Sequence, residues 1–240
     1  MNQPVPPPVP EKGLIARAIG IITSPKATYE AVVRSPRPFG ILLLCAVIIG
    51  LAQTIPQLTE RGRQAALELQ VQQSERWSGK PVTDEQYRAM EQWGRIGAYV
   101  GGVFVLVGLT IWCLLQTAIY WAVFNALLGG TATFKQVLAV VNHSLVIGAL
   151  GLVISAPIML YQGTMSVGGP FNFGALMPML DEGGFLARFL GIVNVFTIWG
   201  LIVLAIGLGV LYRRKTANIA IALFLAFGMI GVAFIAATNR

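Results

Sequence analysis

His143 is the sole histidine among the 240 residues and the side chain best suited to acid–base or metal chemistry. One histidine cannot build an HExxH site or a three-histidine zinc site. Asp84 and Asp181, the two aspartates, both fall outside the apolar stretches, which excludes an intramembrane aspartyl protease. Ser144 follows His143 directly, and neighbouring residues on a helix point in different directions, which disfavours a serine dyad. We therefore predict no catalytic residue, no metal site and no cofactor.

Other polar side chains lie within the apolar stretches, where each needs a hydrogen-bond partner. Their simplest role is hydrogen bonding between membrane helices, typically worth about 0.6 kcal/mol for each bond. The alternative is a pocket around Asn142 and His143 that binds a lipid headgroup or a small ligand. The residues concerned are Gln53, Gln116, Asn125, Asn142, His143, Ser144 and Asn194.

The composition excludes a soluble globular protein. Hydrophobic residues make up 55% of the chain and charged residues only 11%, against about 25% charged residues in an ordinary soluble domain. The mean hydropathy is +0.71. Cys45 and Cys113 lie in apolar stretches, where we expect them to behave as small hydrophobic residues. No charged residue lies within a predicted span, which disfavours an ion-coupled transporter.

Charge-free windows long enough to cross about 30 Å of hydrocarbon define the membrane helices. Thr133 and Gln136 form a capping box at the start of the third. Segment 161–180 is rich in glycine and proline and is predicted to be a loop, with a re-entrant hairpin as the alternative. The fold class is thus all-α, a polytopic membrane protein whose five transmembrane helices lie at about 39–58, 97–128, 136–160, 189–212 and 217–237.

Two regions lie outside these spans. A disordered, proline-rich tail at 1–13 lacks the apolar run of a cleaved signal peptide, and cytosolic short helices follow at 14–37, ahead of the membrane domain 38–237. Residues 60–95 form an outer helical loop that extends into water between the first two spans. Thr83 and Gln86 make a second capping box there, so the helix that becomes span two begins near Asp84.

The first short helix is predicted to lie in the membrane interface. Its apolar positions recur at helical spacing, and its basic residues can meet anionic lipid headgroups. The apolar positions are Leu14, Ile15, Ala18, Ile19 and Ile22, and the basic ones are Lys12, Arg17 and Lys26. Burial of the apolar face is expected to contribute more to the free energy of membrane binding than the charges do.

The charges predict the orientation of the chain. Nine Lys/Arg and two Asp/Glu fall on the side of the N-terminus, whereas eight and eight fall on the opposite side. The positive-inside rule counts Lys/Arg near span ends, and by total count the margin is only nine to eight. The basic residues that adjoin spans lie on the side of the N-terminus, so we predict that the N-terminus is cytosolic and the C-terminus lies outside. Five basic residues adjoin spans on the inner side and are candidate contacts for lipid or for partner proteins: Arg34, Arg37, Arg213, Arg214 and Lys215.

The order of several short motifs resembles the prokaryotic branch of the Yip domain family, the Ypt/Rab-interacting membrane proteins. These motifs are Ile22-Thr23-Ser24-Pro25, Arg34-Ser35-Pro36, Gly129-Gly130, Thr133 to Leu138, Asn142-His143-Ser144, Ile198-Trp199 and Gly207-Leu208-Gly209. The resemblance implies five spans and a cytosolic N-terminus. Eukaryotic members bind Rab GTPases, but their Asp-Leu-Tyr-Gly-Pro stretch is absent from this sequence.

These observations together favour a non-enzymatic adaptor or organiser in a prokaryotic plasma membrane. Its expected partners are membrane lipids and proteins at the cytosolic face, and no nucleic acid. Glycines such as Gly97, Gly101, Gly228 and Gly231 allow close helix packing within one bundle or in a homo-oligomer. The alternative function is a passive transporter, channel or lipid-translocating protein that uses a polar pocket on span three.

Overall fold

The computed structural model describes residues 13–166, 168–175, 177, 179–180 and 184–237, so most of the predicted proline-rich tail lies outside the described residues. The described residues form helices and no strand, which confirms the all-α prediction. In order, the helices are α1 (Leu14–Thr23), α2 (Pro25–Arg34), α3 (Pro38–Gln57), α4 (Glu60–Ser78), α5 (Asp84–Trp121), η1 (Ala122–Leu127, a π-helix), α6 (Phe134–Gln162), α7 (Phe185–Ile192), α8 (Val195–Tyr212) and α9 (Thr216–Ala237).

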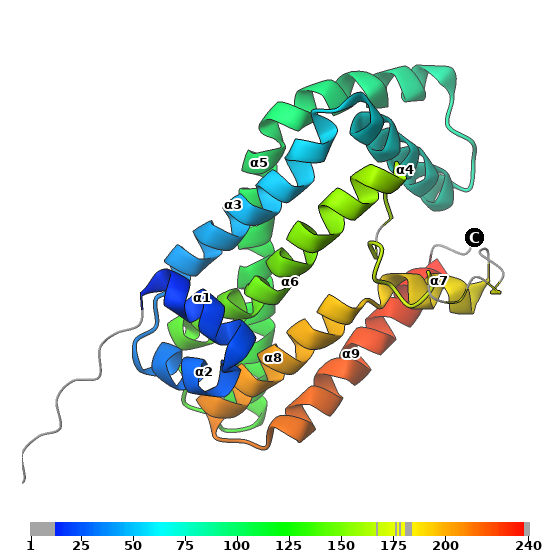
Figure 1. The fold of residues 1–240 in the computed structure, drawn as a ribbon. Helices are drawn as coiled ribbons and strands as arrows, with labels where there is room; N and C mark the ends of the chain where they lie inside the picture. Colours follow the sequence, from blue (N-terminus) through cyan, green and yellow to red (C-terminus); the bar gives the residue numbers. More distant parts are fainter. Residues whose placement is uncertain (1–12, 167, 176, 178, 181–183, 238–240) are drawn as a thin grey trace, which may run out of the picture.

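Five of these helices are long and apolar enough to cross a membrane, as predicted: α3, α5 with η1 from Val100 to Leu127, α6, α8 and α9. Helix α6 is the centre of the bundle, between α3 and α8 (Figure 1). In its apolar window 61% of the residues are buried, against 11% in the window of α5. The outer faces of α5 and α9 are therefore left for lipid.

The connections gather at two opposite ends of the bundle. Helices α1 and α2, the turn before α6 and the turn between α8 and α9 lie at one end, which we call the inner end (Figure 1). Helix α4, the first part of α5 and helix α7 lie at the other, the outer end. Both predicted capping boxes are confirmed, at Thr83 with Gln86 and at Thr133 with Gln136.

The fourth span is shorter than the predicted 189–212. Helix α8 begins at Val195, and Phe189 belongs to the separate helix α7. Asn194 separates the two helices because its backbone is extended and it acts as the N-cap of α8. Its Oδ1 accepts a hydrogen bond from Thr197 N at 2.8 Å. The local sequence is apolar on both sides of this break, so the hydropathy pattern alone predicts one continuous helix.

The segment that follows α6 forms backbone hydrogen bonds with the residues between α7 and α8. Phe173 N donates to Val193 O at 2.9 Å, and Val195 N donates to Phe171 O at 3.3 Å. These bonds satisfy backbone groups on both stretches, which a helix through residues 193–195 would otherwise have paired internally. The described residues of segment 161–180 after Gln162 contain turns and bends and no helix.

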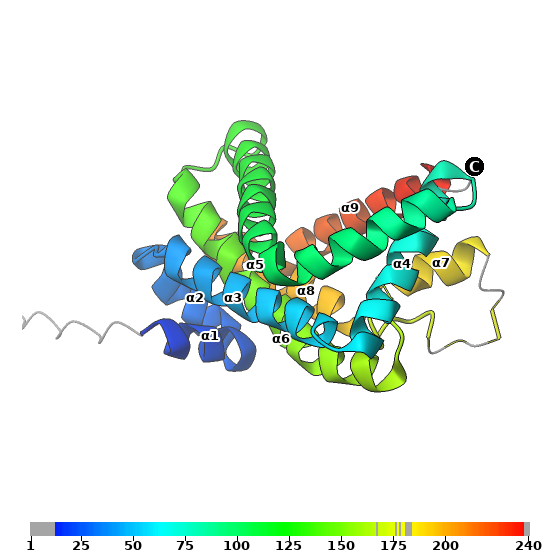
Figure 2. The same cartoon turned by 90° about the horizontal axis from the view of Figure 1, so that it is seen from above.

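The outer helical loop predicted at 60–95 is a hairpin of α4 and the first part of α5. At its start Gly62 packs against the Pro56 carbonyl with no room for a Cβ, and Thr59 Oγ1 accepts a hydrogen bond from Gly62 N at 3.1 Å. The hairpin folds across the outer end instead of extending straight into water (Figures 1 and 2). Trp77 at the end of α4 meets Phe234 of α9 edge to face, with 5.7 Å between ring centroids.

At the inner end, α2 packs against both α6 and α8 through Tyr29, which is fully buried. Gly207 of α8 lies beneath this ring: a Cβ there would come 2.6 Å from Val140 Cγ1 and 2.8 Å from Tyr29 Cε1. Only glycine permits the observed approach of the three helices, because both neighbours are themselves buried.

We predict that Gly207→Ala destabilises the protein by about 1–3 kcal/mol because the added methyl overpacks this contact. Gly200→Ala in the same helix is the matched control, since no described atom lies within 4 Å of its Cβ position. The control should leave stability unchanged or raise it, because alanine favours helix. Thermal unfolding in detergent measures both variants. Equal melting temperatures for the two would contradict the packing at Gly207.

Candidate functional site

Asn142 lies on the inner half of α6 and is fully buried. Its Nδ2 donates to Pro38 O, in the first turn of α3, at 3.1 Å. The bond ties the start of the first span to the central helix, across more than a hundred residues of sequence. It is the interhelical role that the intramembrane position predicts for a polar side chain.

His143 is also fully buried, and its Nδ1 lies 2.6 Å from Ala139 O in the same helix. Neither His143 nor Asn142 lines either of the two cavities described below. Asn142 Oδ1 and His143 Nε2 have no hydrogen-bond partner within the described part of the chain. The ligand pocket expected at these two residues stays a prediction, and the contacts found so far are those of helix packing.

Arg17 of α1 does not reach the lipid headgroups as the sequence predicted. Its side chain is 3% exposed, and Nη1 donates to Ser35 O, at the C-cap of α2, at 3.0 Å. The prediction was wrong because helix periodicity places Arg17 opposite the apolar face, and α2 turns back to cover that side. Gly20 packs against Thr28 with no room for a Cβ, so α1 and α2 cross closely.

Helices α1 and α2 form a second hairpin, which we call the hairpin from here on. Two further side chains bind it to α6. Gln136 Nε2 donates to Val33 O, in the last turn of α2, at 3.3 Å. Tyr29 OH lies 3.5 Å from Val140 O, and burial raises the pKa of the Tyr29 phenol, which is therefore neutral at every physiological pH. The hairpin is thus fixed to the bundle by polar contacts under its buried face.

The opposite face of α1 is exposed and apolar. Ile15 is 59% exposed, Ile19 is 55% exposed and Leu14 is 40% exposed. Three large aliphatic side chains on one helix face are the surface that an interfacial helix presents to lipid. Ile22, predicted on the same face, is half-buried against the core.

The five predicted basic contacts all lie at the inner end, and all are exposed. We call them the inner basic surface: Arg34, Arg37, Arg213, Arg214 and Lys215. They come from two parts of the sequence, and the packing of α2 on α8 places both parts at the same end of the bundle. Arg213 ends α8 in a left-handed conformation with φ 52°. Arg214 Nη2 donates to Leu128 O at 2.7 Å, so this arginine also holds the turn that follows η1.

The same turn receives two more side-chain donors. Trp121 Nε1 and Asn125 Nδ2 both donate to Ala132 O, at 3.1 Å and 2.7 Å. Phe124 stacks on Tyr212 at 4.5 Å between ring centroids, which fastens η1 to the end of α8. These contacts fix the turn after η1 and the end of α8, which carry part of the inner basic surface.

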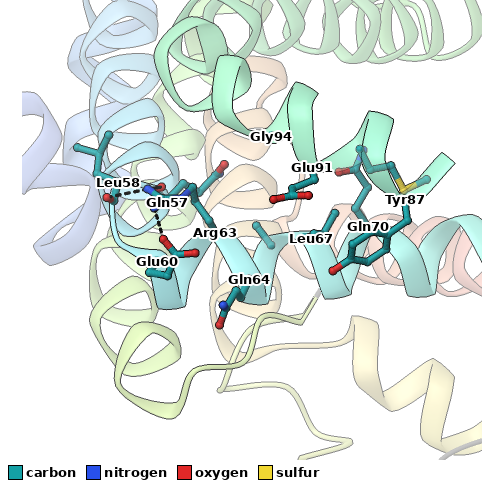
Figure 3. Close-up of a pocket in the computed structure, with 12 residues that line it drawn as sticks. Gln57, Leu58, Glu60, Arg63, Gln64, Leu67, Gln70, Tyr87, Glu91 and Gly94 are labelled. Carbon is teal, nitrogen blue, oxygen red and sulfur yellow. Dashed lines mark hydrogen bonds and ion pairs between the residues drawn. The ribbon is translucent and has the colours of Figure 1, made fainter. Parts of the chain in front are cut away.

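Two cavities lie at the outer end, and sequence reasoning named neither. The first, of about 670 Å³, lies between the end of α3, α4 and the first part of α5. Figure 3 shows Gln57, Glu60 and Arg63 gathered at its α3 end, with Tyr87 and Glu91 of α5 facing α4. Arg63 pairs with Glu60 and donates to Leu58 O at 3.0 Å, so this cluster neutralises itself.

The second cavity, of about 680 Å³, lies between α4, α7, the end of α9 and the segment after α6. Its wall includes Arg76, Trp77, Asn172, Arg188 and Phe234. Arginine 76 and arginine 188 lie more than a hundred residues apart in sequence, so no local signal pairs them. Throughout the described residues, no three His, Cys, Asp or Glu side chains gather as a metal site would require.

Comparison with known proteins identifies the family. A model of the Yip1 domain matches residues 19–238, a range that covers the end of α1, all of α2 and all five membrane helices. The chain belongs to the Yip1 domain family. "Membrane protein YknW" of Bacillus subtilis is similar to this Yip1 domain protein, with 27% identity over 202 residues, 84% of this chain and 78% of the relative. No solved structure matches it.

The family match confirms the resemblance, and the bacterial relative agrees with the prokaryotic branch. Several resemblance motifs lie at the contacts described above. Arg34-Ser35-Pro36 ends α2 at the Arg17 bond, Gln136 and Asn142 donate from α6, and Gly207 admits Tyr29. In this Yip1 domain protein, these motif positions therefore build the inner end.

We predict that Asn142→Ala lowers the free energy of unfolding by about 1–2 kcal/mol, since the substitution removes the bond to Pro38 and leaves a cavity. Asn218→Ala on the exposed face of α9 is the matched control and should have no effect beyond about 0.5 kcal/mol. Urea titration in mixed micelles compares them. If Asn142→Ala were as stable as the control, the buried bond would not support the fold.

Proposed function

We propose that this Yip1 domain protein is a non-enzymatic membrane adaptor that binds partner proteins through the inner basic surface. The observation that carries the proposal is the fixed arrangement of this surface. The packing of α2 on α8 sets the position of Arg34, and the end of α8 sets the positions of Arg213 to Lys215. A rigid charged surface loses little conformational entropy on binding, which favours a partner of complementary acidic charge.

The charge balance of the inner end supports the same proposal. Seven of its described basic residues are exposed, against one exposed acidic residue, Glu30, on α2. The seven are the inner basic surface together with Lys26 and Lys135. Such a surface attracts anionic lipid and acidic protein segments alike. We assign the lipid contact to α1 with its apolar face, and the protein contact to the inner basic surface.

We further propose that the inner end is cytosolic, that the C-terminus lies on the opposite side, and that the membrane is the plasma membrane. The Lys/Arg residues that adjoin span ends, which form the inner basic surface, support this orientation. A Cβ added at Gly97 or Gly228 would meet no described atom within 4 Å outside its own helix turn, which leaves space for a second copy in the membrane.

The orientation predicts which introduced cysteines react on intact cells. Lys80→Cys between α4 and α5 should react with a membrane-impermeant maleimide, whereas Lys215→Cys should react only after the membrane is opened. Both positions are exposed, and the native Cys45 and Cys113 are buried. Inverted vesicles should reverse the pattern. Equal labelling of both variants on intact cells would contradict the proposed topology.

The adaptor function predicts discrete protein adducts at the inner basic surface. A photoreactive amino acid at Lys215 should cross-link another membrane protein in cells, and the adduct should be lost with Arg34→Glu and Arg213→Glu. Val107 on the lipid face of α5 is 52% exposed and is the control position. Arg88→Glu at the outer end is the control for charge reversal and should leave the adduct intact.

Two results would contradict the adaptor. The first is that Lys215 yields lipid adducts only. The second is flux of ions, small solutes or labelled lipid through proteoliposomes of the pure protein, reduced by His143→Gln but not by Asn218→Ala. That second result would favour the passive transporter with a polar pocket on span three.

A further inference from the structure

The outer cavity between α4, α7 and α9 has the chemistry of a site for an amphiphilic anion. From the burial, charge and position of its wall we propose that it binds the phosphate headgroup of an anionic phospholipid. Its volume of about 680 Å³ falls within the range of about 300–1,000 Å³ typical of ligand sites. The proposal does not depend on the adaptor function or on the orientation of the chain.

The charge of the wall selects an anion. Arg76 of α4 lines the cavity, and no Asp or Glu is among its described lining residues. Arg188 of α7 lies in the same wall but already has an interaction partner, so Arg76 is the arginine available to a ligand. Arg76 is exposed and has no carboxylate partner within the described part of the chain. Guanidinium groups bind phosphate oxygens through paired, charge-assisted hydrogen bonds. Glutamines 72 and 73 add amide donors beside Arg76.

The position of the cavity selects a lipid over a free phosphate. Phe234 and Ile235, in the last turn of α9, line it, so the cavity opens where span five ends. Trp77 lies 65% exposed against Phe234. Aromatic side chains at this depth are typical of the headgroup region. An acyl chain can leave the cavity along the exposed apolar surface of α9, where Ile230 is 70% exposed.

The floor of the cavity is built before any ligand arrives. Asn172 is 8% exposed, and its Oδ1 accepts a hydrogen bond from Ala175 N at 2.8 Å. Asn194 Nδ2 donates to Gly168 O at 2.9 Å, and Gly168 packs on the Gly191 carbonyl of α7 with no room for a Cβ. These contacts hold the segment after α6 against α7. The wall is therefore preorganised, which lowers the cost of binding.

The other outer cavity, beneath α5, is a weaker candidate for the same ligand. Glu60 and Glu91 line it, and Arg63, the one arginine among its described lining residues, is already paired with Glu60. An anion would have to compete with these carboxylates. The difference between the two cavities gives the experiment an internal control at the same end of the molecule.

Titration of the full-length protein in detergent micelles, followed by native mass spectrometry, tests the proposal. Phosphatidylglycerol should bind in preference to phosphatidylcholine, and Arg76→Gln should weaken that binding about five- to tenfold. Ala187→Phe, which fills the cavity but keeps its charges, should weaken it equally. Arg88→Gln, an exposed arginine away from the cavity, and Arg63→Gln in the other cavity should change nothing.

Each alternative outcome overturns the proposal. Equal affinity for the two lipids would mean that the cavity does not recognise an anionic headgroup. Equal weakening by Arg76→Gln and Arg88→Gln would mean that lipid binding depends only on the net charge of the protein. Displacement of the lipid by an equal concentration of glycerol phosphate would assign the cavity to a soluble phosphate. Melting curves of all four variants must match that of the unmodified protein. If they do not, Gln72→Ala and Gln73→Ala replace Arg76→Gln, and each should weaken the binding of phosphatidylglycerol about threefold.

Discussion

A backbone carbonyl at the end of a helix costs free energy when neither water nor protein donates a hydrogen bond to it, and this cost is largest at membrane depth. The inner end of this bundle is organised by that constraint. Side-chain donors reach the carbonyls of Val33 and Ser35 at the end of α2, and those of Leu128 and Ala132 in the turn before α6. Each donor belongs to a different helix from its acceptor or lies across a turn. The bonds that satisfy the carbonyls therefore also set the positions of the helices.

The arrangement follows from the central place of α6. Its N-terminal turn carries Gln136, which serves the capping box and also donates to Val33 O. Asn142 reaches α3 from further along the same helix. Tyr29 enters from α2 and rests over Gly207 of α8. The hairpin of α1 and α2 thus packs against the inner ends of α3, α6 and α8. The inner basic surface lies at the same end of the bundle.

Local signals predicted local structure well. Capping boxes at Thr83 and Thr133 are readable because the donor and acceptor are three residues apart, and spans are readable because lipid demands long apolar helices. The break at Asn194 was not predictable, since it depends on pairing with residues 171–173 from a distant segment. The burial of Arg17 and the gathering of Arg76 with Arg188 are likewise tertiary, and helix periodicity alone points Arg17 away from the apolar face without saying what covers it.

The hairpin of α1 and α2 is fixed to the bundle through its contacts with α6 and α8. Double electron–electron resonance between spin labels at Lys26→Cys in α2 and Lys215→Cys at the end of α8 measures this directly, in lipid nanodiscs and in a Cys45→Ala, Cys113→Ala background. We expect one narrow distance distribution that broadens when Gln136→Ala and Tyr29→Phe remove the polar contacts between α2 and α6. A broad distribution in the unmodified background, or a narrow one that persists without both donors, would contradict it.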